Sequence, residues 1–367
     1  MRGVADVAET SEGHVTRRTI PVRQGEGFDV ERVWTYLRQH VPRVPDELPK
    51  VEQFPSGASN LTYYLQSGPF AGVLRRPPFG PLPPKAHDMA REAAILEKLH
   101  PNFPLAPRPL VFCDDPSLIG SPFYIMEYRP GVVLDDRFPQ EIDPKPELCQ
   151  RISYAVIDTL ADLHSVDYEA SGLAAFGHPE GFLARQVHGW IERYQRAQTD
   201  DIRGVEHLTR WLAERVPTSQ GATVIHNDFK LNNIVLDASA LDRPVAVVDW
   251  EMTTIGDPLM DLAITLSYWV QANDPVELRQ MLPTVTQLPG FLSRRDLIEY
   301  YAKRTGRDLS AIDYYLVFAY FKLAVILQQI YVRWKRGQTA DERFANFGAR
   351  VATIVAHALS AIEEAGV

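Results

Sequence analysis

The chain has 367 residues, of which 45% are hydrophobic and 23% charged, values typical of globular proteins that exclude disordered and collagen-like chains. Its 38 Lys and Arg against 47 Asp and Glu give a net charge of −9, which argues against nucleic acid as a partner, because nucleic-acid-binding faces need clustered positive charge. The length predicts two domains or lobes, and the two cysteines are too few for a disulfide scaffold or a Cys-rich zinc site.

No segment has a pattern typical of a targeting signal or a membrane anchor. Residues 1–27 are polar and mixed in charge, without the apolar core of a secretory signal, and we assign them to a flexible N-terminal arm. The longest apolar stretch, 318–330, is interrupted by Lys322 and is shorter than the ~20 apolar residues that span a bilayer. We therefore expect a cytoplasmic protein with reduced cysteines and no membrane partner.

The first part of the chain predicts a β-rich lobe. Apolar residues recur at helical spacing over 30–41, with Asp29 before them and Pro42 after them, as is typical of helix ends. Runs of β-forming residues predict strands at 61–65, 72–74, 111–112 and 123–126. One helix is predicted over 90–99, and the Pro-rich segment 77–84 is expected to be irregular. We assign residues 28–126 to an N-terminal nucleotide-binding lobe.

After Pro130 and Gly131 the pattern becomes mainly helical. Apolar periodicity predicts helices at 148–164, 182–197, 206–215, 259–270 and 311–334. A short β island at 224–250 interrupts them. We therefore expect an α+β fold in which a hinge at 127–131 joins the N-terminal lobe to a mainly helical C-terminal catalytic lobe, 132–367, with a small β insert.

The β insert contains the most specific pattern in the chain. An apolar strand leads into His226 and Asp228, Asn233 follows five residues after Asp228, and a second apolar strand, 245–248, ends in Asp249. Phosphoryl transfer from a nucleotide needs one carboxylate to orient or deprotonate the attacking hydroxyl. It also needs an amide oxygen and a second carboxylate to hold Mg²⁺ across the phosphates. Strand ends hold such groups rigidly, as electrostatic preorganisation requires.

This block, together with the segment Gly256-Asp257-Pro258-Leu259-Met260-Asp261, resembles the aminoglycoside phosphotransferase family. The wider family includes choline, fructosamine and homoserine kinases, and its pattern is H-x-D-x-x-x-x-N followed by an apolar strand and Asp. The resemblance runs from about residue 51 to about residue 266, and more loosely to residue 334. It implies a bilobal protein-kinase-like fold with ATP as the co-substrate and Mg²⁺ as the cofactor.

The resemblance implies a role for each residue of the pattern. Asp228 would be the catalytic base, or the residue that positions the substrate hydroxyl, and Asn233 and Asp249 would be the Mg²⁺ ligands. For His226 we expect a structural hydrogen bond to the loop backbone. Asp257 and Asp261 resemble positions that brace the catalytic loop and open the next helix, and Asp257 directly before a proline is typical of an N-cap.

The loop between the first two strands matches the family less well. Ser56, Gly57, Ser59 and Asn60 lie where the loop that covers the phosphates is expected, and they would offer hydroxyl, amide and backbone donors to phosphate. The segment has one glycine instead of a full G-x-G-x-x-G, so an ordinary hairpin loop is the alternative.

The cation that reaches the phosphates from the third strand is predicted to be Arg75, where the family pattern has a lysine. Arginine carries the charge and can hold phosphate through two donors, but it is not equivalent to lysine. Glu92 would be its partner on the helix, unless it is a solvated helix charge. Arg76 and Lys85 are competitors, and strand alternation turns Arg76 to the opposite face from Arg75. Leu74 would share that opposite face, which indicates a covering helix.

The segment 123–131 resembles the hinge of the family, an apolar strand that leads into a Pro-Gly turn. Adenine would pack against Met126 and bond to backbone groups near Glu127, Tyr128 and Arg129. An edge strand is the alternative.

The acceptor is the least defined part of the prediction. Segments 74–80, 86–92 and 256–258 look most like the family branch whose kinase domain also occurs fused to acyl-CoA dehydrogenases, which implies a hydroxyacyl-CoA as the small-molecule hydroxyl substrate. We expect no dehydrogenase domain, because the chain ends at Val367. The alternative is an antibiotic kinase, since the negative net charge would steer a cationic substrate. The alternative of another class is a degenerate nucleotide-binding partner protein, which Arg75 and the glycine-poor loop favour. ATP versus GTP and the oligomeric state stay open.

Overall fold

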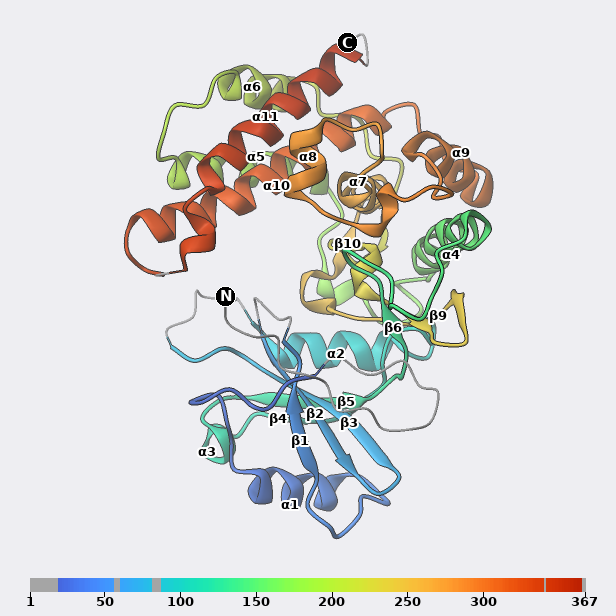
Figure 1. Ribbon diagram of the computed structural model, residues 1–367, viewed down its shortest axis with the longest axis vertical. Coiled ribbons are helices and arrows are strands. Elements are labelled where there is room, and N and C mark those ends of the chain that lie inside the picture. Colours follow the sequence, from blue (N-terminus) through green and yellow to red (C-terminus); the bar gives the residue numbers. More distant parts are fainter. Residues whose placement is uncertain (1–18, 56–59, 81–86, 340, 365–367) are drawn as a thin grey trace.

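The computed structural model of the chain describes residues 19–55, 60–80, 87–339 and 341–364. The elements form two lobes, one built around a sheet and one built mainly from helices, with the sheet lobe at the bottom of Figure 1. This arrangement confirms the predicted bilobal α+β architecture.

The N-terminal lobe is a five-stranded antiparallel sheet with the order β1-β2-β3-β5-β4. Its strands are β1 (Lys50–Gln53), β2 (Leu61–Ser67), β3 (Phe70–Arg76), β4 (Pro109–Cys113) and β5 (Phe123–Glu127). Helix α1 (Val30–His40) lies on the face that points away from the other lobe, and α2 (Met89–Leu99) lies between the sheet and the other lobe (Figure 1). A short helix, α3 (Pro116–Ile119), joins β4 to β5.

Alternation along β3 assigns its residues to the two faces of the sheet. Leu74 is fully buried in the cluster that α1 forms with the outer face through Trp34 and Leu37, so the helix expected to cover this face is present. Val73 belongs to the other cluster, together with residues of α2. Since successive side chains of a strand point to opposite faces, Arg75 lies on the side of α2 and of the second lobe.

The last residues of the predicted N-terminal arm are attached to this sheet. Ile20 and Gln53 exchange two backbone hydrogen bonds of 2.8 Å, and the Arg23 N–H donates to the Gln53 side chain over 3.0 Å. The Tyr63 hydroxyl also donates to the carbonyl of Glu26. This segment is therefore attached to the sheet beside β1 through an isolated bridge and two side-chain contacts.

The C-terminal lobe contains most of the helices and two small sheets. Its helices are α4 (Pro146–His164), α5 (Phe182–Ala197), α6 (Val205–Glu214), α7 (Pro258–Tyr268), α8 (Val276–Met281), α9 (Arg294–Thr305), α10 (Ile312–Lys335) and α11 (Phe347–Glu364). The strands are β6 (Val132–Val133), β7 (Thr223–Ile225), β8 (Ile234–Asp237), β9 (Ala240–Val247) and β10 (Thr254–Gly256), in the orders β6-β8-β9 and β10-β7. Short 3₁₀ turns are η1 (Ala174–Phe176), η2 (Leu231–Asn233), η3 (Trp250–Met252), η4 (Val285–Gln287) and η5 (Glu342–Phe344).

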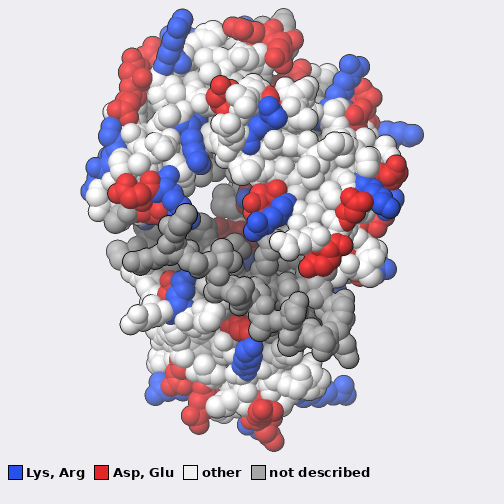
Figure 2. Space-filling view, viewed as in Figure 1, with Lys and Arg blue, Asp and Glu red and all other residues white. Residues whose placement is uncertain are grey.

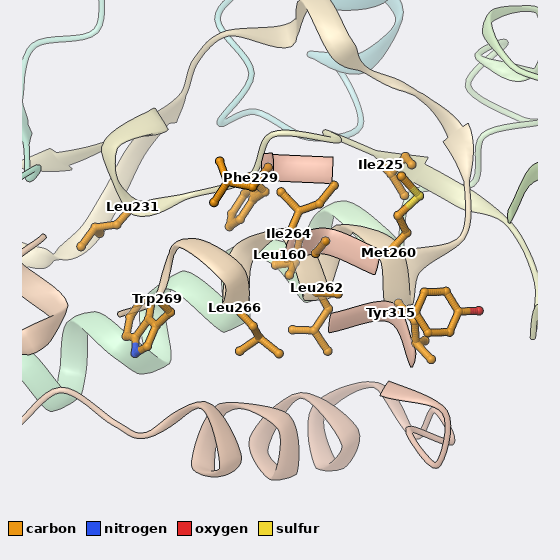
Figure 3. Packing of buried hydrophobic residues seen from close by; sticks show 14 of the residues in the cluster. Leu160, Ile225, Phe229, Leu231, Met260, Leu262, Ile264, Leu266, Trp269 and Tyr315 are labelled. Atoms are coloured by element: carbon orange, nitrogen blue, oxygen red, sulfur yellow. The ribbon is translucent and has the colours of Figure 1, made fainter. Parts of the chain in front are cut away.

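Helix α7 is at the centre of this lobe. The side chain of Asp257 accepts a hydrogen bond of 2.9 Å from the Leu259 N–H, so the predicted N-cap is present. The apolar residues of α7 pack with those of α4, β7 and α10, as Figure 3 shows for Leu160, Ile225, Met260, Leu262, Ile264 and Tyr315. Helix α7 begins nine residues after Asp249 and is almost entirely buried. It therefore forms a rigid support for the segment that carries the motif residues.

Two helical segments, Ile312–Lys335 and Glu342–Glu364, are long and apolar enough to cross a membrane by length and composition. The apolar window of the first is 67% buried inside the protein, and that of the second 33%. A mostly buried core helix passes the same test, so these segments are weak evidence for a membrane span.

Candidate active site

The loop after β7 brings two motif residues into direct contact. The Asn233 amide donates to the Asp228 backbone carbonyl over 2.9 Å and to its carboxylate over 3.2 Å. The Nε2 atom of His226 lies 3.0 Å from the carbonyl oxygen of Val248, which is the structural hydrogen bond expected for this histidine. Hydrogen bonds within the loop therefore hold Asp228 next to Asn233, and His226 connects this loop to the residue that follows β9.

Asp249 reaches the same place from β9. The Val248 N–H donates to the carbonyl of Asn233 over 2.9 Å, which sets the chain just before Asp249 beside η2. Asp249 itself has a φ of 72°, a left-handed conformation that is uncommon for a residue other than glycine and is found often at functional sites. Asp228, Asn233 and Asp249, the three residues to which the resemblance gives catalytic and metal-binding roles, are thus adjacent in the fold.

Arg75 joins this group from the other lobe. Its guanidinium lies 2.9 Å from Asp249 Oδ1, 3.3 Å from Glu92 Oε1 and 3.9 Å from Glu251 Oε2, and its side chain is only 8% exposed. Burial by itself lowers the pKa of Arg75, but the carboxylates of Glu92 and Asp249 raise it above its usual range, so the cation is firmly held. The predicted pair of Arg75 with Glu92 is confirmed, whereas contact with phosphate stays a prediction.

The same guanidinium affects the predicted metal ligand. Burial favours the neutral form of Asp249, but the Arg75 guanidinium outweighs it and holds the pKa of that carboxyl below its usual value. Asp249 is therefore ionised at neutral pH, as a ligand for Mg²⁺ must be.

The two competitors for the role of Arg75 are placed differently. Arg76 lies on the outer face of the sheet, where its guanidinium is 4.3 Å from the centre of the Phe79 ring. Lys85 lies outside the described residues. Of the two adjacent arginines, only Arg75 faces the motif, in agreement with strand alternation.

The predicted phosphate loop is described only at its end. Asn60 donates to Glu251 across the lobes over 2.7 Å, and its side-chain oxygen lies 2.9 Å from Nδ1 of His87. Ser56, Gly57 and Ser59 lie outside the described residues. Asn60 thus connects the residue before β2 to the opposite lobe, and its role towards phosphate stays a prediction.

The predicted hinge begins at the end of β5. Met126 is 5% exposed and packs in the cluster shared with α2. The N–H groups of Glu127 and Tyr128 donate to the carbonyls of Arg108 over 2.9 Å and Ala71 over 3.4 Å. The Glu127 carboxylate accepts from the side chain of Arg129 over 2.7 Å. Any adenine contact of this segment would therefore use groups other than those two N–H donors.

A buried acid of α7 braces residues 226–233, the loop after β7 that carries the predicted base and that we call the catalytic loop. Asp261 accepts 2.7 Å hydrogen bonds from the N–H groups of both His226 and Asn227. Nε2 of His164, from α4, lies 3.3 Å from the same carboxylate, and Tyr301 lies 2.6 Å from the other ring nitrogen. Burial opposes ionisation, but the hydrogen bond from His164 and the nearby donors lower the pKa of Asp261. The bracing role that the resemblance gave to Asp261 is present, and His164 is an addition.

Lys230 is, after His164, a second residue of the site to which the sequence analysis gave no role. Its ammonium lies 2.9 Å from the Asp228 carboxylate and 4.8 Å from the centre of the Tyr268 ring. Burial lowers the pKa of Lys230, but Asp228 and Tyr268 outweigh it, so the pKa is raised. Its position two residues after Asp228 was the available sequence signal.

The oxygen atoms of Asn233 and Asp249 suit a magnesium ion. The Asn233 amide nitrogen is turned towards Asp228, so its oxygen Oδ1 faces away and accepts no hydrogen bond from the residues that the structure describes. Asp249 uses Oδ1 for Arg75 and keeps a 36% exposed side chain. Mg²⁺ prefers hard oxygen ligands and commonly takes one or two from the protein, with the rest from phosphates and water. These two residues fit that requirement.

The Arg75→Ala variant should bind ATP more weakly by on the order of 2 kcal/mol, the scale of a charge-assisted hydrogen bond. Its affinity for adenosine should be almost unchanged. The reason is that only ATP presents phosphates to the guanidinium. Calorimetric titration of both ligands measures the difference, with Arg76→Ala as the matched control and Lys85→Ala as a third variant. A phosphate-dependent loss confined to Arg76→Ala or Lys85→Ala would assign the role to another cation.

Sequence comparison identifies relatives of this chain. Residues 50–292 match the model of the phosphotransferase enzyme family. Acyl-CoA dehydrogenase family member 11 from Rattus norvegicus is 35% identical over 340 residues, and family member 10 from Mus musculus is 33% identical over 325 residues. The alignments cover 90% and 88% of this chain but 43% and 30% of those proteins, so the chain spans less than half of either.

Comparison of the fold gives similar proteins of known structure. A candidate aminoglycoside phosphotransferase from Ralstonia eutropha superposes with a TM-score of 0.79 at 28% identity, covering 92% of this chain and 99% of that one. Choline kinase from Cryptosporidium parvum gives 0.63 at 15% identity, over 92% and 96%. A ternary complex of aminoglycoside phosphotransferase APH(4)-Ia with AMP-PNP and hygromycin B gives 0.58 at 17%, over 90% and 98%. The predicted kinase-like fold is thereby confirmed.

Proposed function

Because the chain belongs to the phosphotransferase enzyme family, we propose that it is a kinase that transfers the γ-phosphate of Mg-ATP to a hydroxyl group of a small molecule. The observation that carries the proposal is the contact of Arg75 with Asp249 beside the Asp228–Asn233 pair. The support is that one cation, two side-chain oxygen donors and a further carboxylate lie together, the groups that the proposed transfer needs. A cytoplasmic location, where ATP is available, belongs to the proposal.

Each residue has a defined task in this mechanism. Asp228 accepts a hydrogen bond from the acceptor hydroxyl and takes its proton as the acceptor oxygen bonds to the γ-phosphorus. The bond between that phosphorus and the bridging oxygen of ADP breaks, and ADP leaves. Lys230, paired with the Asp228 carboxylate, keeps the base oriented, and Arg75 binds phosphate oxygens from the other lobe. Mg²⁺, held by Asn233 and Asp249, would neutralise phosphate charge.

A hydroxyacyl-CoA is the acceptor that we propose. The support is that relatives named acyl-CoA dehydrogenase family members 11 and 10 share 35% and 33% identity with this chain over most of its length. A kinase segment in the same chain as an acyl-CoA dehydrogenase is expected to act on a related thioester. Here the reactive group would be the hydroxyl of the acyl chain.

An antibiotic kinase is the second candidate, because the complex of APH(4)-Ia that shares this fold contains hygromycin B. Such a polycationic acceptor would be attracted by a concentrated acidic surface. On the face shown in Figure 2, however, the described acidic and basic residues are interspersed and form no concentrated acidic surface. The third candidate, a nucleotide-binding protein without turnover, is disfavoured because Asp228, Asn233 and Asp249 are all present and adjacent.

A panel of acceptors tests the proposal. The purified protein is incubated with Mg-ATP or Mg-GTP and with hydroxyacyl-CoAs that carry the hydroxyl at successive positions, hygromycin B, or choline. Mass spectrometry detects the added phosphoryl group, and ADP formation gives the rate. Turnover of the thioesters supports the proposed acceptor, and turnover of hygromycin B alone supports the antibiotic kinase. Mg-ATP binding without any turnover across the panel would favour the nucleotide-binding protein.

A further inference from the structure

Helix α10 carries a lysine in a place where a cation is costly. Lys322 is 5% exposed, in the middle of an otherwise largely apolar helix that packs on α5, α7 and α11. No ion pair with a carboxylate is found for it among the residues that the structure describes. A buried ammonium without a carboxylate partner needs compensation by hydrogen bonds, so its contacts indicate why it is there.

The hydrogen bonds of Lys322 go to a single residue of the catalytic loop, Asn227. The Lys322 ammonium donates to the backbone carbonyl of Asn227 over 3.0 Å and to its side-chain oxygen over 2.9 Å. The ring of Trp190, from α5, lies 5.6 Å from the same ammonium. Lys322 and Asn227 are 95 positions apart in the sequence, and the hydrogen bonds between them are buried.

Asn227 has an unusual conformation that these bonds can maintain. Its φ is 65°, in the left-handed region, which is uncommon for residues other than glycine, although asparagine adopts it more readily than most. Its N–H donates to Asp261 over 2.7 Å, and its amide nitrogen donates to the carbonyl of Met252 over 3.3 Å. Asp261 therefore fixes the backbone N–H of Asn227, and Lys322 fixes its backbone carbonyl oxygen and its side-chain oxygen.

We propose that Lys322 is a positioning residue that fixes the catalytic loop at Asn227 and thereby sets the orientation of Asp228. This inference rests on the proposed kinase function, in which Asp228 receives the proton of the acceptor. The carbonyl of Asn227 belongs to the peptide bond that leads into Asp228, so a donor on that carbonyl fixes the peptide plane. Because the site must hold Asp228 in one geometry, loss of the donor should slow the chemical step more than nucleotide binding.

The charge of Lys322 is consistent with this role. Burial lowers its pKa to about 8, while the carboxylates of Asp228 and Asp261 work to raise it, and Lys230 and Arg193 work in the same direction as burial. At neutral pH the ammonium is therefore mostly protonated. Its positive charge attracts the carboxylates of Asp228 and Asp261, and its hydrogen bonds to Asn227 are charge-assisted.

Hydrogen exchange of the protein without ligands tests the positioning directly. In Lys322→Met, amides of residues 223–233 should exchange about tenfold faster than in the wild type, which corresponds to one charge-assisted hydrogen bond. The matched control is Gln328→Met, because Gln328 is also a buried polar residue of α10, and it bonds to Ala197 and Thr199 instead. Exchange over 223–233 should be unchanged in that control. Equal exchange in Lys322→Met and the wild type would overturn the proposal.

A second variant protects the test against misfolding. Lys322→Gln removes the charge but leaves one side-chain donor, so its exchange over 223–233 should lie between wild type and Lys322→Met. If Lys322→Met does not fold, Lys322→Gln must still exchange faster than the wild type, and protection equal to wild type would overturn the proposal.

Kinetics then separate positioning from general stability. With the acceptor that the panel identifies, Lys322→Met should lower kcat about tenfold and change the KM for ATP by less than about twofold, with Gln328→Met unaffected. An unchanged kcat in the folded variant would refute the effect on Asp228. If the wild type phosphorylates no acceptor in the panel, the proposed function fails, and the exchange measurement still decides whether Lys322 fixes the loop.

Discussion

The Asp228→Asn variant is expected to lose most turnover while it binds Mg-ATP almost as tightly as the wild type. Asparagine keeps the size of the side chain and an oxygen for Asn233, but it cannot take a proton and no longer pairs ionically with Lys230. General-base catalysis contributes roughly a hundredfold to ten-thousandfold, so the loss of kcat should fall in that range. Steady-state ADP formation with the identified acceptor and calorimetry with Mg-ATP measure the two quantities.

A matched surface variant controls for the loss of an aspartate charge. Asp242 pairs with Arg151 over 2.6 Å on the outside of the C-terminal lobe, and Asp242→Asn should change neither turnover nor nucleotide affinity. A large loss of Mg-ATP affinity in Asp228→Asn would contradict its assignment to the acceptor hydroxyl. Retention of full turnover would remove Asp228 from the mechanism.

Asp249→Ala is expected to have the opposite signature, a loss of Mg-ATP binding itself. The change removes one proposed oxygen ligand of the metal and also one carboxylate partner of Arg75. We expect affinity for Mg-ATP to fall at least about tenfold, or about 1.4 kcal/mol, with a smaller effect on ATP measured without Mg²⁺. Calorimetry at several Mg²⁺ concentrations separates the metal from the nucleotide.

The conservative variant at the same position serves as the control. Asp249→Asn keeps one oxygen that can face a metal and should lie between the wild type and Asp249→Ala in Mg²⁺ dependence. If Asp249→Ala and Asp228→Asn lose Mg-ATP affinity equally, the division of roles between acceptor and metal is wrong. An affinity that does not depend on Mg²⁺ in any variant would remove Asp249 as a ligand.

Local patterns in the sequence determined the elements that carry strong periodicity and clear ends. The helix after Asp29 was predicted from the position of Asp29 and from apolar residues at helical spacing. In the structure Asp29 accepts a hydrogen bond of 3.0 Å from the Arg32 N–H and caps the helix. The segment of α5 was predicted at its observed bounds, Phe182–Ala197, from its apolar periodicity alone, since no side chain caps its first turn. Helix α9 was not predicted, because only Leu297 and Tyr301 are buried along it and they form too sparse a stripe.

The motif residues were also available from the sequence, because their order and spacing resemble the H-x-D-x-x-x-x-N pattern and following Asp of the phosphotransferase family. The loop between β7 and β8, which ends in the 3₁₀ turn η2, brings Asp228 to Asn233 over five positions, and pairing of β8 with β9 adds Asp249. Alternation along a single strand put Arg75 and Arg76 on opposite faces, and the resemblance indicated that Arg75 is the one on the side of the site. Each of these inferences needs only short-range geometry and the pairing of neighbouring strands.

The remaining parts of the site depend on contacts between distant segments. Lys322 reaches Asn227 across 95 positions, His164 reaches Asp261 across 97, and Asn60 reaches Glu251 across 191. In the sequence, Lys322 appears only as an interruption of an apolar stretch. Periodicity reports which side of an element is buried, but not which other element will face it. That pairing is decided when the helices pack around α7, so only the tertiary structure shows that a lysine from α10 supports the catalytic loop.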